Sequence, residues 1–351
     1  MRRLHLAGGD SVVGRLAASG VDGEFLCWSD VLHEGPVPGG LSPEQLNTVR
    51  ATFLAQRYAS GSLDDVRRAL QARLARLAGA ADDDEVTLWF AHDLADQLRL
   101  LQLLDWFARD RATAPKLTLV SIDAHPEVAR FRELAQLTPR QLSALDWSRR
   151  RVHDGDFELA RRAWAAFTAA EPTGLVELGR DRCRALPFLS RALHRHLQQF
   201  PGSSDGLSRT EREILDHVAL RGGTVREAFE VTQNEYEEAP FLGPATFLHY
   251  VDRLLVGPEP LLDFAVGFRD SRWFHRLRLT AHGRETLAGR RQRHVRGGVD
   301  RWLGGVHLDG PTPAWVWDAA SQSLIAGVRH PPPDTRPDRR GDPPSLGRDS
   351  G

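Results

Sequence analysis

Residues 3–19 read RLHLAGGDSVVGRLAAS, in which a short apolar run leads into two glycines and then into a second, amphipathic stretch. The apolar run predicts a buried strand over residues 3–7, and the second stretch predicts a helix over residues 11–19. A glycine-rich turn between a strand and a helix is typical of folds that bind nucleotides. The segment therefore predicts an α/β fold and raises the question of whether its turn holds a phosphate.

Two nucleotide-binding signatures are incomplete in this segment. Gly9 and Gly14 give the G-x-x-x-x-G frame of a phosphate-binding loop, but Arg15 and Leu16 follow where that loop needs Lys and Ser or Thr. The dinucleotide fingerprint also fails, because two of its glycine positions hold other residues. What remains is the backbone N–H groups at the start of the helix, which can hold an anion.

Strands and helices continue to alternate up to residue 123. Further strands are expected over residues 24–28, 86–91 and 116–122, with helices over residues 43–58, 62–77 and 92–110. Continuous apolar runs indicate strands that are buried on both faces, and alternation with helices indicates a parallel sheet. We therefore predict a mostly parallel, Rossmann-like sheet for a domain spanning residues 1–123.

The rest of the chain predicts four further segments. Residues 124–200 carry apolar residues at helical spacing and are expected to form a helical extension, with one helix over residues 125–137. Residues 207–289 predict three helices followed by two strands, which is the order of a winged helix. Residues 297–329 predict a hairpin, and the polar, proline-rich residues 330–351 predict a disordered tail.

The composition argues against several classes of protein. The chain has 351 residues and a net charge of −1, so its surface as a whole is not a clamp for a polyanion. Two cysteines form neither a disulfide framework nor a zinc knuckle, which suits a reducing compartment. The N-terminal residues lack the apolar core of a signal peptide, and no apolar run reaches membrane-spanning length. A cytoplasmic protein without a membrane partner is expected.

Polar residues follow each of the four predicted parallel strands. Because the carboxyl ends of parallel strands share one edge of a sheet, we expect these residues to lie close together. Four of them are candidates for acid/base catalysis or metal ligation, namely Asp30, Glu34, His92 and Asp93. Ligand binding is expected to involve Gly8, Gly9, Asp10, Ser11, His33, Gln97 and Asp123.

Simpler roles account for several of these residues. Asp10 and Asp93 stand where each can cap the helix that follows it, and capping alone stabilises a helix by about 1 kcal/mol. Capping explains the loop over residues 28–36 less well, because Asp30 and Glu34 lie there outside any expected helix or strand.

The acids of this edge would repel one another unless something bound among them. A divalent metal, an arginine or a polyol would relieve the repulsion. Mixed carboxylate and imidazole ligands suit Mg²⁺, Mn²⁺ or Zn²⁺, and the sequence does not choose among them. The cofactor is therefore open, with a divalent metal as one option, and so is whether the protein is an enzyme.

The expected winged helix carries a weak signal for DNA binding. Its third helix, around residues 243–255, offers only Arg253 and His249 as cations, and residues 208–289 hold more acidic than basic side chains. A DNA reader normally presents a basic face. A role in packing or protein contact is therefore favoured, and nucleic acid is kept as an alternative partner.

Several motifs carry a resemblance to a known family. The segments LHLAGGDSVVGRL, GEFLCWSDVLHEGPVP, WFAHDLADQLRLLQLLDWF and QLTPRQL occur in this order over residues 4–145. The chain resembles, over these residues, the uncharacterised bacterial family catalogued as domain of unknown function 1835. The resemblance implies a shared fold and a shared polar edge that includes Trp28, but it implies no activity.

Three hypotheses follow from the sequence. The first is a protein that binds a small polar ligand, a nucleotide or a phosphorylated metabolite, at the carboxyl edge of the sheet. The second is a ligand-sensing transcriptional regulator that binds DNA through residues 207–289. The third is a structural or protein-interaction protein.

Overall fold

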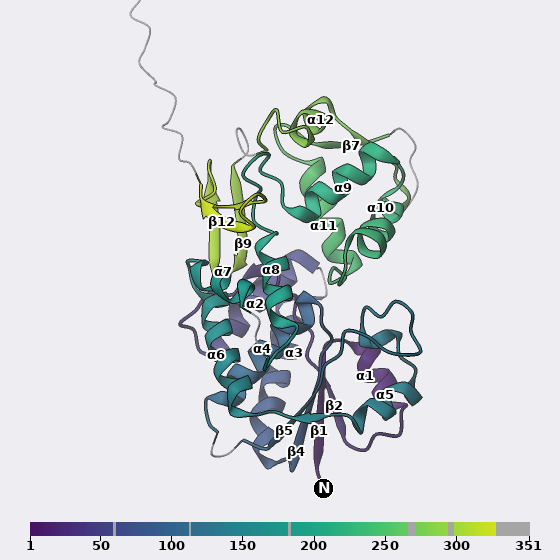
Figure 1. Ribbon diagram of the computed structural model, residues 1–351, viewed down its shortest axis with the longest axis vertical. Coiled ribbons are helices and arrows are strands. Elements are labelled where there is room, and N and C mark those ends of the chain that lie inside the picture. The colour runs from purple at the N-terminus through teal and green to yellow at the C-terminus, as the bar shows by residue number, and fades with distance from the viewer. Residues whose placement is uncertain (59–60, 112–113, 182–183, 266–270, 294–297, 328–351) are drawn as a thin grey trace, which may run out of the picture.

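The computed structural model describes residues 1–58, 61–111, 114–181, 184–265, 271–293 and 298–327. The tail predicted over residues 330–351 lies outside the described residues. In Figure 1 the α/β part occupies the lower half, the helices α9–α12 lie above it, and the strands β9–β12 lie beside those helices. No helix in the described part of the chain combines the length and the apolar character needed to cross a bilayer.

The centre of the α/β part is a sheet of five strands. Its first four strands are parallel, and the short fifth strand pairs antiparallel through Thr118 and Arg151. The order across the sheet is β2 (Glu24–Cys27), β1 (Arg3–Ala7), β4 (Glu85–Trp89), β5 (Lys116–Val120) and β6 (Arg150–Arg151). The prediction of a mostly parallel sheet is thereby confirmed.

The order in which strands are added to the sheet changes side at β1, and we call this place the reversal point. Helix α1 (Asp10–Ala17) leads from β1 to β2 on one side, while β4 pairs with β1 on the other side. Parallel sheets bind ligands outside the carboxyl ends of the strands at such a reversal. The turns that follow β1 and β4 are therefore the place at which the fold itself favours a binding site.

Helices cover both faces of the sheet, and the two faces have separate cores. The face toward α1 and α5 (Pro139–Asp146) holds a smaller core that includes Ala7, Trp89 and Phe131. The opposite face holds the main core, built largely from α4 (Leu94–Ala108) and α6 (Asp154–Thr168). Helices α2 (Pro43–Tyr58) and α3 (Leu63–Ala78) lie on that second side. Successive strand residues point into the two cores in turn, as strand geometry requires.

The segment between β5 and α5 differs from its prediction. The helix expected over residues 125–137 is wrong, because only Leu134–Gln136 form a helical turn, η2, of the 3-10 type. The amide of Val128 closes a turn on the carbonyl of His125 at 3.0 Å, and Phe131 and Leu134 are buried in the smaller core. Burial of these apolar side chains therefore outweighs the helical spacing of the sequence.

The helical extension continues with α6, α7 (Thr173–Arg180) and α8 (Leu189–Leu197). It is followed by α9 (Arg209–Leu220), α10 (Val225–Val231), a π-helical turn η3 (Thr232–Tyr236) and α11 (Pro244–Leu255). The short strands β7 (Leu262–Phe264) and β8 (Leu277–Leu279) pair antiparallel, with the one-turn helix η4 (Arg272–Phe274) between them, and α12 (Ala281–Leu287) follows.

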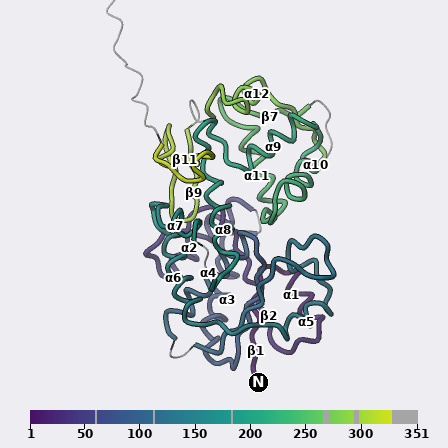
Figure 2. Tube along the Cα trace, in the orientation of Figure 1, coloured from purple at the N-terminus to yellow at the C-terminus, as the bar shows by residue number. Residues whose placement is uncertain are grey.

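The sequence of residues 297–329 predicts one hairpin, and the structure has two there. Strand β9 (Val299–Gly304) pairs with β10 (Val306–Gly310), and β11 (Trp315–Asp318) pairs with β12 (Ser323–Ala326). Strand β9 also pairs in parallel with β3 (Gly35–Pro36), which follows the acidic loop of the α/β part. The Cα trace in Figure 2 shows this late part of the chain returning to the level of α7 and α8. The β9–β10 hairpin is thus joined to the α/β part by backbone pairing.

Candidate functional site

A cavity of about 540 Å³ lies at the reversal point between β1 and β4. One wall comes from the turns after these strands and from the segment before η2. The other wall comes from α10, η3 and the start of α11. The side chains and backbone that matter below are Gly8 to Ser11, Asp93, Asp96, Arg99, Arg132 and Glu133 from the first wall, and Phe229, Gln233, Asn234, Phe241 and Leu242 from the second.

The start of α1 is open toward this cavity. Gly9 is the N-cap residue and no side chain caps the helix, so the first N–H groups have no side-chain acceptor. A Cβ added at Gly9 would meet nothing within 4 Å, whereas a Cβ at Gly8 would lie 2.1 Å from Oδ1 of Asp96. The two glycines therefore have different roles, since Gly8 permits close packing against α4 and Gly9 leaves space in front of α1.

The start of α4 is held by two carboxylates. Asp93 is the N-cap and accepts a hydrogen bond from the amide of Asp96 at 3.1 Å. Asp96 in turn accepts from the amide of Ala91 at 2.7 Å and forms an ion pair of 2.9 Å with Arg99. Gln97 is buried and donates to the carbonyl of Ala91 at 2.6 Å. The capping role considered for Asp93 is observed, and the same residue lines the cavity.

The protonation of Asp93 differs from that of an ordinary aspartate. Burial raises its pKa well above the usual value, and the neighbouring charge of Asp96 raises it further. Burial also raises the pKa of Glu133, which belongs to the same wall of the cavity. Both shifts favour the neutral acid, so the repulsion expected among the acids of this edge is reduced by protonation. Within the described residues, no three His, Cys, Asp or Glu side chains are grouped as metal ligands.

Asp30 lies in a buried ion pair away from the cavity lining. Its two oxygens accept from Arg50 at 2.7 and 3.1 Å. The same guanidinium donates to the carbonyls of Val31 at 3.0 Å and Glu34 at 2.8 Å. Burial alone would raise the pKa of Asp30, but the charge and hydrogen bonds of Arg50 outweigh it, and the pKa lies below its usual value. The 28–36 loop is thus folded around one arginine of α2.

Glu34 joins a second buried cluster. Its Oε1 accepts from the hydroxyl of Tyr250 and from Arg301 at 2.8 Å, and Gln199 donates to the same hydroxyl at 2.7 Å. Burial is the largest single influence and would raise the pKa of Glu34, but the charge of Arg301 and the hydrogen bond from Tyr250, with smaller charge effects, together hold that pKa below its usual value. Glu34 and Arg301 also line a separate cavity of about 550 Å³ between α2 and β9. This cluster connects residues from the N-terminal loop, the segment after α8, α11 and the β9–β10 hairpin.

His33 is a neutral side chain of the interior. Burial lowers its pKa to about 3, and its ring meets the ring of Phe241 edge-on at 5.1 Å. Neither ring nitrogen has a hydrogen-bond partner among the described residues. His33 therefore supports the side chain of Phe241, which does line the cavity.

His92 directly precedes Asp93 in the turn between β4 and α4, but it lines a different cavity. It lines a smaller cavity of about 230 Å³ together with residues of α8 and α9. Burial lowers its pKa, and the nearby charge of Arg191 lowers it further. Asp123 is half-exposed and forms a 3.7 Å ion pair with the same arginine. The consecutive residues His92 and Asp93 thus line two different cavities.

Trp28 is buried beneath α3. Its indole N–H donates to Gln102 at 2.8 Å, and the guanidinium of Arg73 lies 4.4 Å from its ring centroid. It lines a fourth cavity of about 260 Å³ on the α2 side of the sheet, apart from the reversal point. The residues predicted as one site are therefore distributed over several places, and Gly8, Gly9, Asp10, Ser11 and Asp93 are the ones that share the cavity at the reversal point.

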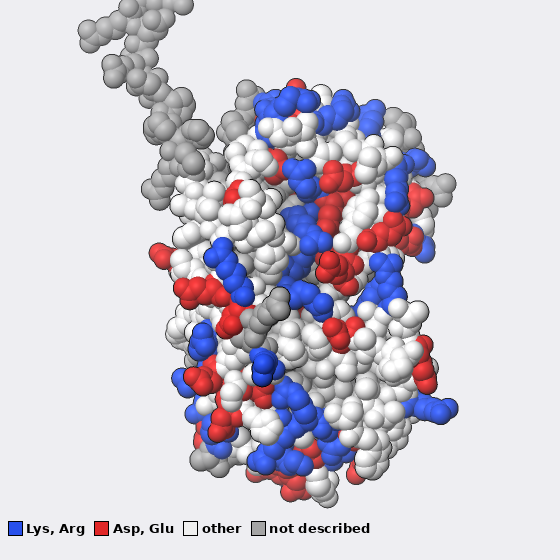
Figure 3. Space-filling model, in the orientation of Figure 1, with Lys and Arg blue, Asp and Glu red and all other residues white. Residues whose placement is uncertain are grey.

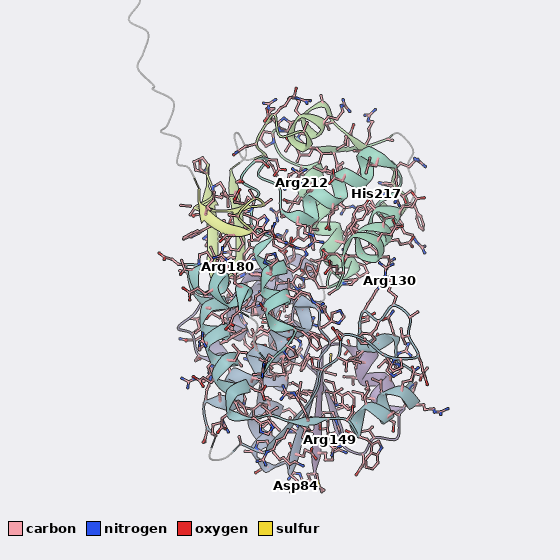
Figure 4. The ribbon with its side chains drawn as sticks, viewed as in Figure 1. Asp84, Arg130, Arg149, Arg180, Arg212 and His217 are labelled. Atoms are coloured by element: carbon pink, nitrogen blue, oxygen red, sulfur yellow. The ribbon has the colours of Figure 1, made fainter. Side chains whose placement is uncertain are left out.

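Sequence reasoning missed the basic and amide residues of this cavity. Arg99 follows Asp96 at a spacing of three in α4, which is a readable helical pair. Arg132, Gln233 and Asn234 gave no comparable signal, because they reach the cavity through an irregular segment and a π-helical turn. In Figure 4, the labelled Arg130 on the same segment as Arg132 points toward the helices of the upper part.

A scan of protein-family models and a search of curated proteins found no match to this chain.

Proposed function

We propose that this protein binds a small anionic ligand, a nucleotide or a phosphorylated metabolite, in the cavity at the β1–β4 reversal point. The observation that carries the proposal is the uncapped start of α1, which opens into a cavity of about 540 Å³. Cavities of this size are within the range that holds small-molecule ligands. A helix start that lacks a side-chain cap offers N–H groups and the positive end of the helix dipole to an anion.

The charges around the cavity oppose an anion less than their number implies, and Asp10 in the first turn of α1 is the acid of this lining that an anion meets first. Asp96 is already paired with Arg99, and the pKa values of Asp93 and Glu133 are raised toward the neutral acid. Arg132 adds a second cation on the facing segment. An anion therefore meets fewer negative charges than the sequence implies, and a divalent metal becomes an option to be tested alongside it.

We propose further that residues 207–289 form a winged-helix-like module that packs against the α/β part. The order α9, α10, α11, β7 and β8 supports this, as does an antiparallel bridge between Thr224 and Arg276 beside the hairpin. Helix α11, which would enter a DNA groove, is occupied by the N-terminal domain: Tyr58 lies 3.1 Å from the hydroxyl of Thr246 and meets the ring of His249 edge-on.

These contacts weigh against the alternative of a DNA-binding regulator. A groove-reading helix must present its side chains to the nucleic acid, and α11 presents part of them to α2. Basic and acidic side chains are also interleaved over much of the face drawn in Figure 3. Salt-dependent retention of the full chain on DNA would restore that alternative. We also propose that the chain belongs to the family that it resembles over residues 4–145.

The experiment is a thermal-shift panel with nucleotides, sugar phosphates and inorganic phosphate, each with Mg²⁺, with Mn²⁺ and with a chelator. Ligands that bind the native state raise its stability by mass action. The blocking variant is Gly9→Glu, because a side chain at this position has free space and brings a negative charge to the start of α1. The matched control is Gly14→Glu, which adds the same side chain at an exposed position of the same helix with nothing within 4 Å.

The expected result is a shift with at least one phosphate compound that is lost in Gly9→Glu and kept in Gly14→Glu. If no phosphate compound shifts the native protein, or if both variants keep the shift, the proposed site is wrong. Dependence of the shift on Mg²⁺ or Mn²⁺ would show that a cation bridges the ligand and the carboxylates.

A further inference from the structure

The cavity at the reversal point has two chemically different ends. The end formed by the α/β part offers the start of α1 together with Arg99. The end formed by α10 and the segment before α11 offers Phe229, Phe241 and Leu242. Phe241 and Leu242 are buried, at 8% and 6% exposed. A ligand that fills the cavity must therefore combine an anionic group with a flat or apolar group.

The apolar end contains an amide with an unused donor. Gln233 is 4% exposed and lines the cavity. Its Oε1 accepts from the backbone amide of Leu242, at 3.4 Å, and this bond fixes which end of the side-chain amide carries the nitrogen. Its Nε2 has no hydrogen-bond partner among the described residues. A buried N–H₂ group without an acceptor costs about 1 to 3 kcal/mol, so a ligand that supplies the acceptor recovers that energy.

Local backbone structure holds this donor in place. Gln233 and Asn234 belong to the π-helical turn that follows α10, and the amide of Glu237 closes the turn on the carbonyl of Thr232 at 3.0 Å. π-helical turns of this kind occur often at functional sites. Asn234 accepts from Arg132 across the cavity, so the two walls are already joined beside Gln233.

The aromatic residue of this end is also fixed from behind. The rings of Phe241 and His33 meet edge-on, with 5.1 Å between their centroids. The guanidinium of Arg195 lies 5.0 Å from the centroid of the Phe241 ring. Arg195 is itself held by a buried ion pair with Glu237. A ring that is supported in this way is a preorganised contact surface for a flat group.

We propose that the ligand of this cavity is a nucleotide, with its phosphate at the start of α1 and its base against Phe241, where Gln233 donates to an acceptor on the edge of the base. Every nucleobase presents carbonyl or ring-nitrogen acceptors on its edge, and it has a flat apolar face. A sugar phosphate carries the anion but has no flat group for Phe241. This inference rests on the proposed function and narrows its ligand class.

The test compares binding of AMP, GMP, UMP, ribose 5-phosphate and inorganic phosphate to the full chain by calorimetry. A nucleotide is expected to bind at least about 10-fold more tightly than ribose 5-phosphate, which corresponds to one satisfied hydrogen bond and the contact with the ring. Gln233→Met removes the donor and adds no charge that would repel the phosphate. That variant is expected to weaken the nucleotide about 10-fold and to leave ribose 5-phosphate unchanged.

The matched control is Gln71→Met, the same substitution at an exposed position of α3. A second variant, Phe241→Leu, is expected to lower the affinity for nucleotides more than the affinity for ribose 5-phosphate. The comparison of ligands on the native protein does not depend on any variant. Ribose 5-phosphate binding as tightly as the nucleotides, or equal losses for both ligands in Gln233→Met, would overturn the nucleotide assignment and leave the anion site standing. Failure of every phosphate compound to bind would instead remove the proposed function itself.

Discussion

Asp93 and Asp30 both follow a parallel strand of the central sheet, both are acidic and both are buried, at 5% and 3% exposed. Their partners differ. Asp30 meets the guanidinium of Arg50 in a two-bond ion pair, whereas Asp93 meets a second carboxylate, Asp96, and the open cavity. The pKa of Asp30 is lowered by its arginine, and the pKa of Asp93 is raised by its burial.

The difference separates a carboxylate that holds the fold from one that is available to a ligand. A buried ion pair is costly to break, because either partner alone is left as an uncompensated charge. A buried carboxyl with no cation of its own is held neutral at some expense, and perturbed groups of this kind gather at functional sites. The 28–36 loop is therefore assigned to the scaffold, and the β4–α4 turn to the site.

Removal of Asp30 is expected to have the largest effect on stability. Asp30→Ala leaves Arg50 buried without its counter-charge, and such changes cost about 3 to 5 kcal/mol. Denaturant unfolding of the variant and the native protein measures the loss. The double variant Asp30→Asn with Arg50→Met should lose less than the two single changes together, since the pair acts as a unit. A loss below about 1 kcal/mol in Asp30→Ala would contradict the role of Asp30 in holding the fold.

Tyr250→Phe is expected to have the next largest effect. The hydroxyl of Tyr250 donates to Glu34 and accepts from Gln199, so its removal leaves two buried polar groups short of a partner. The expected loss is about 2 kcal/mol, and the same denaturant measurement checks it. Because the cluster lies outside the lining of the proposed site, ligand affinity should not change. A loss of affinity without a loss of stability would place this cluster in the site.

The strands and most helices could be predicted because each depends on residues close together in the chain. The apolar runs around Leu6 and Leu88 specify strands, and Ser62 and Thr138 cap helices through contacts three residues away. It could also be predicted that His92 and Asp93 line different cavities, because successive residues at the end of a strand point to opposite faces of the sheet. The rest depends on distant partners: Arg301 reaches Glu34 from a hairpin at the other end of the chain, and no local pattern marks it.

Gly8→Ala is expected to lower both stability and ligand affinity, because Gly8 packs against Asp96 of α4 and also lines the cavity. A Cβ at Gly8 would lie 2.1 Å from Oδ1 of Asp96, so the ion pair of Asp96 with Arg99 has to move. Overpacking of this kind costs about 1 to 3 kcal/mol, and it should also weaken any ligand held at the start of α1. The control is Gly14→Ala, where a Cβ meets nothing within 4 Å and the exchange in a helix stabilises by about 0.5 to 1 kcal/mol. Equal stabilities of the two variants would mean that Gly8 has no packing role.

The smallest expected effect is a change in pH dependence at Asp93. Because its pKa is raised in the folded protein, the native state binds this proton more tightly than the unfolded state does. The contribution of Asp93 to stability is therefore fully present below its unfolded pKa, near 4, and is lost as pH rises through the raised folded pKa. Asp93→Asn keeps a good N-cap and removes this titration. Unfolding free energies measured from about pH 4 to about pH 8 should fall more steeply for the native protein than for Asp93→Asn. Parallel curves would mean that Asp93 is ionised in the folded state, and the cavity would then carry the negative charge that an anionic ligand has to overcome.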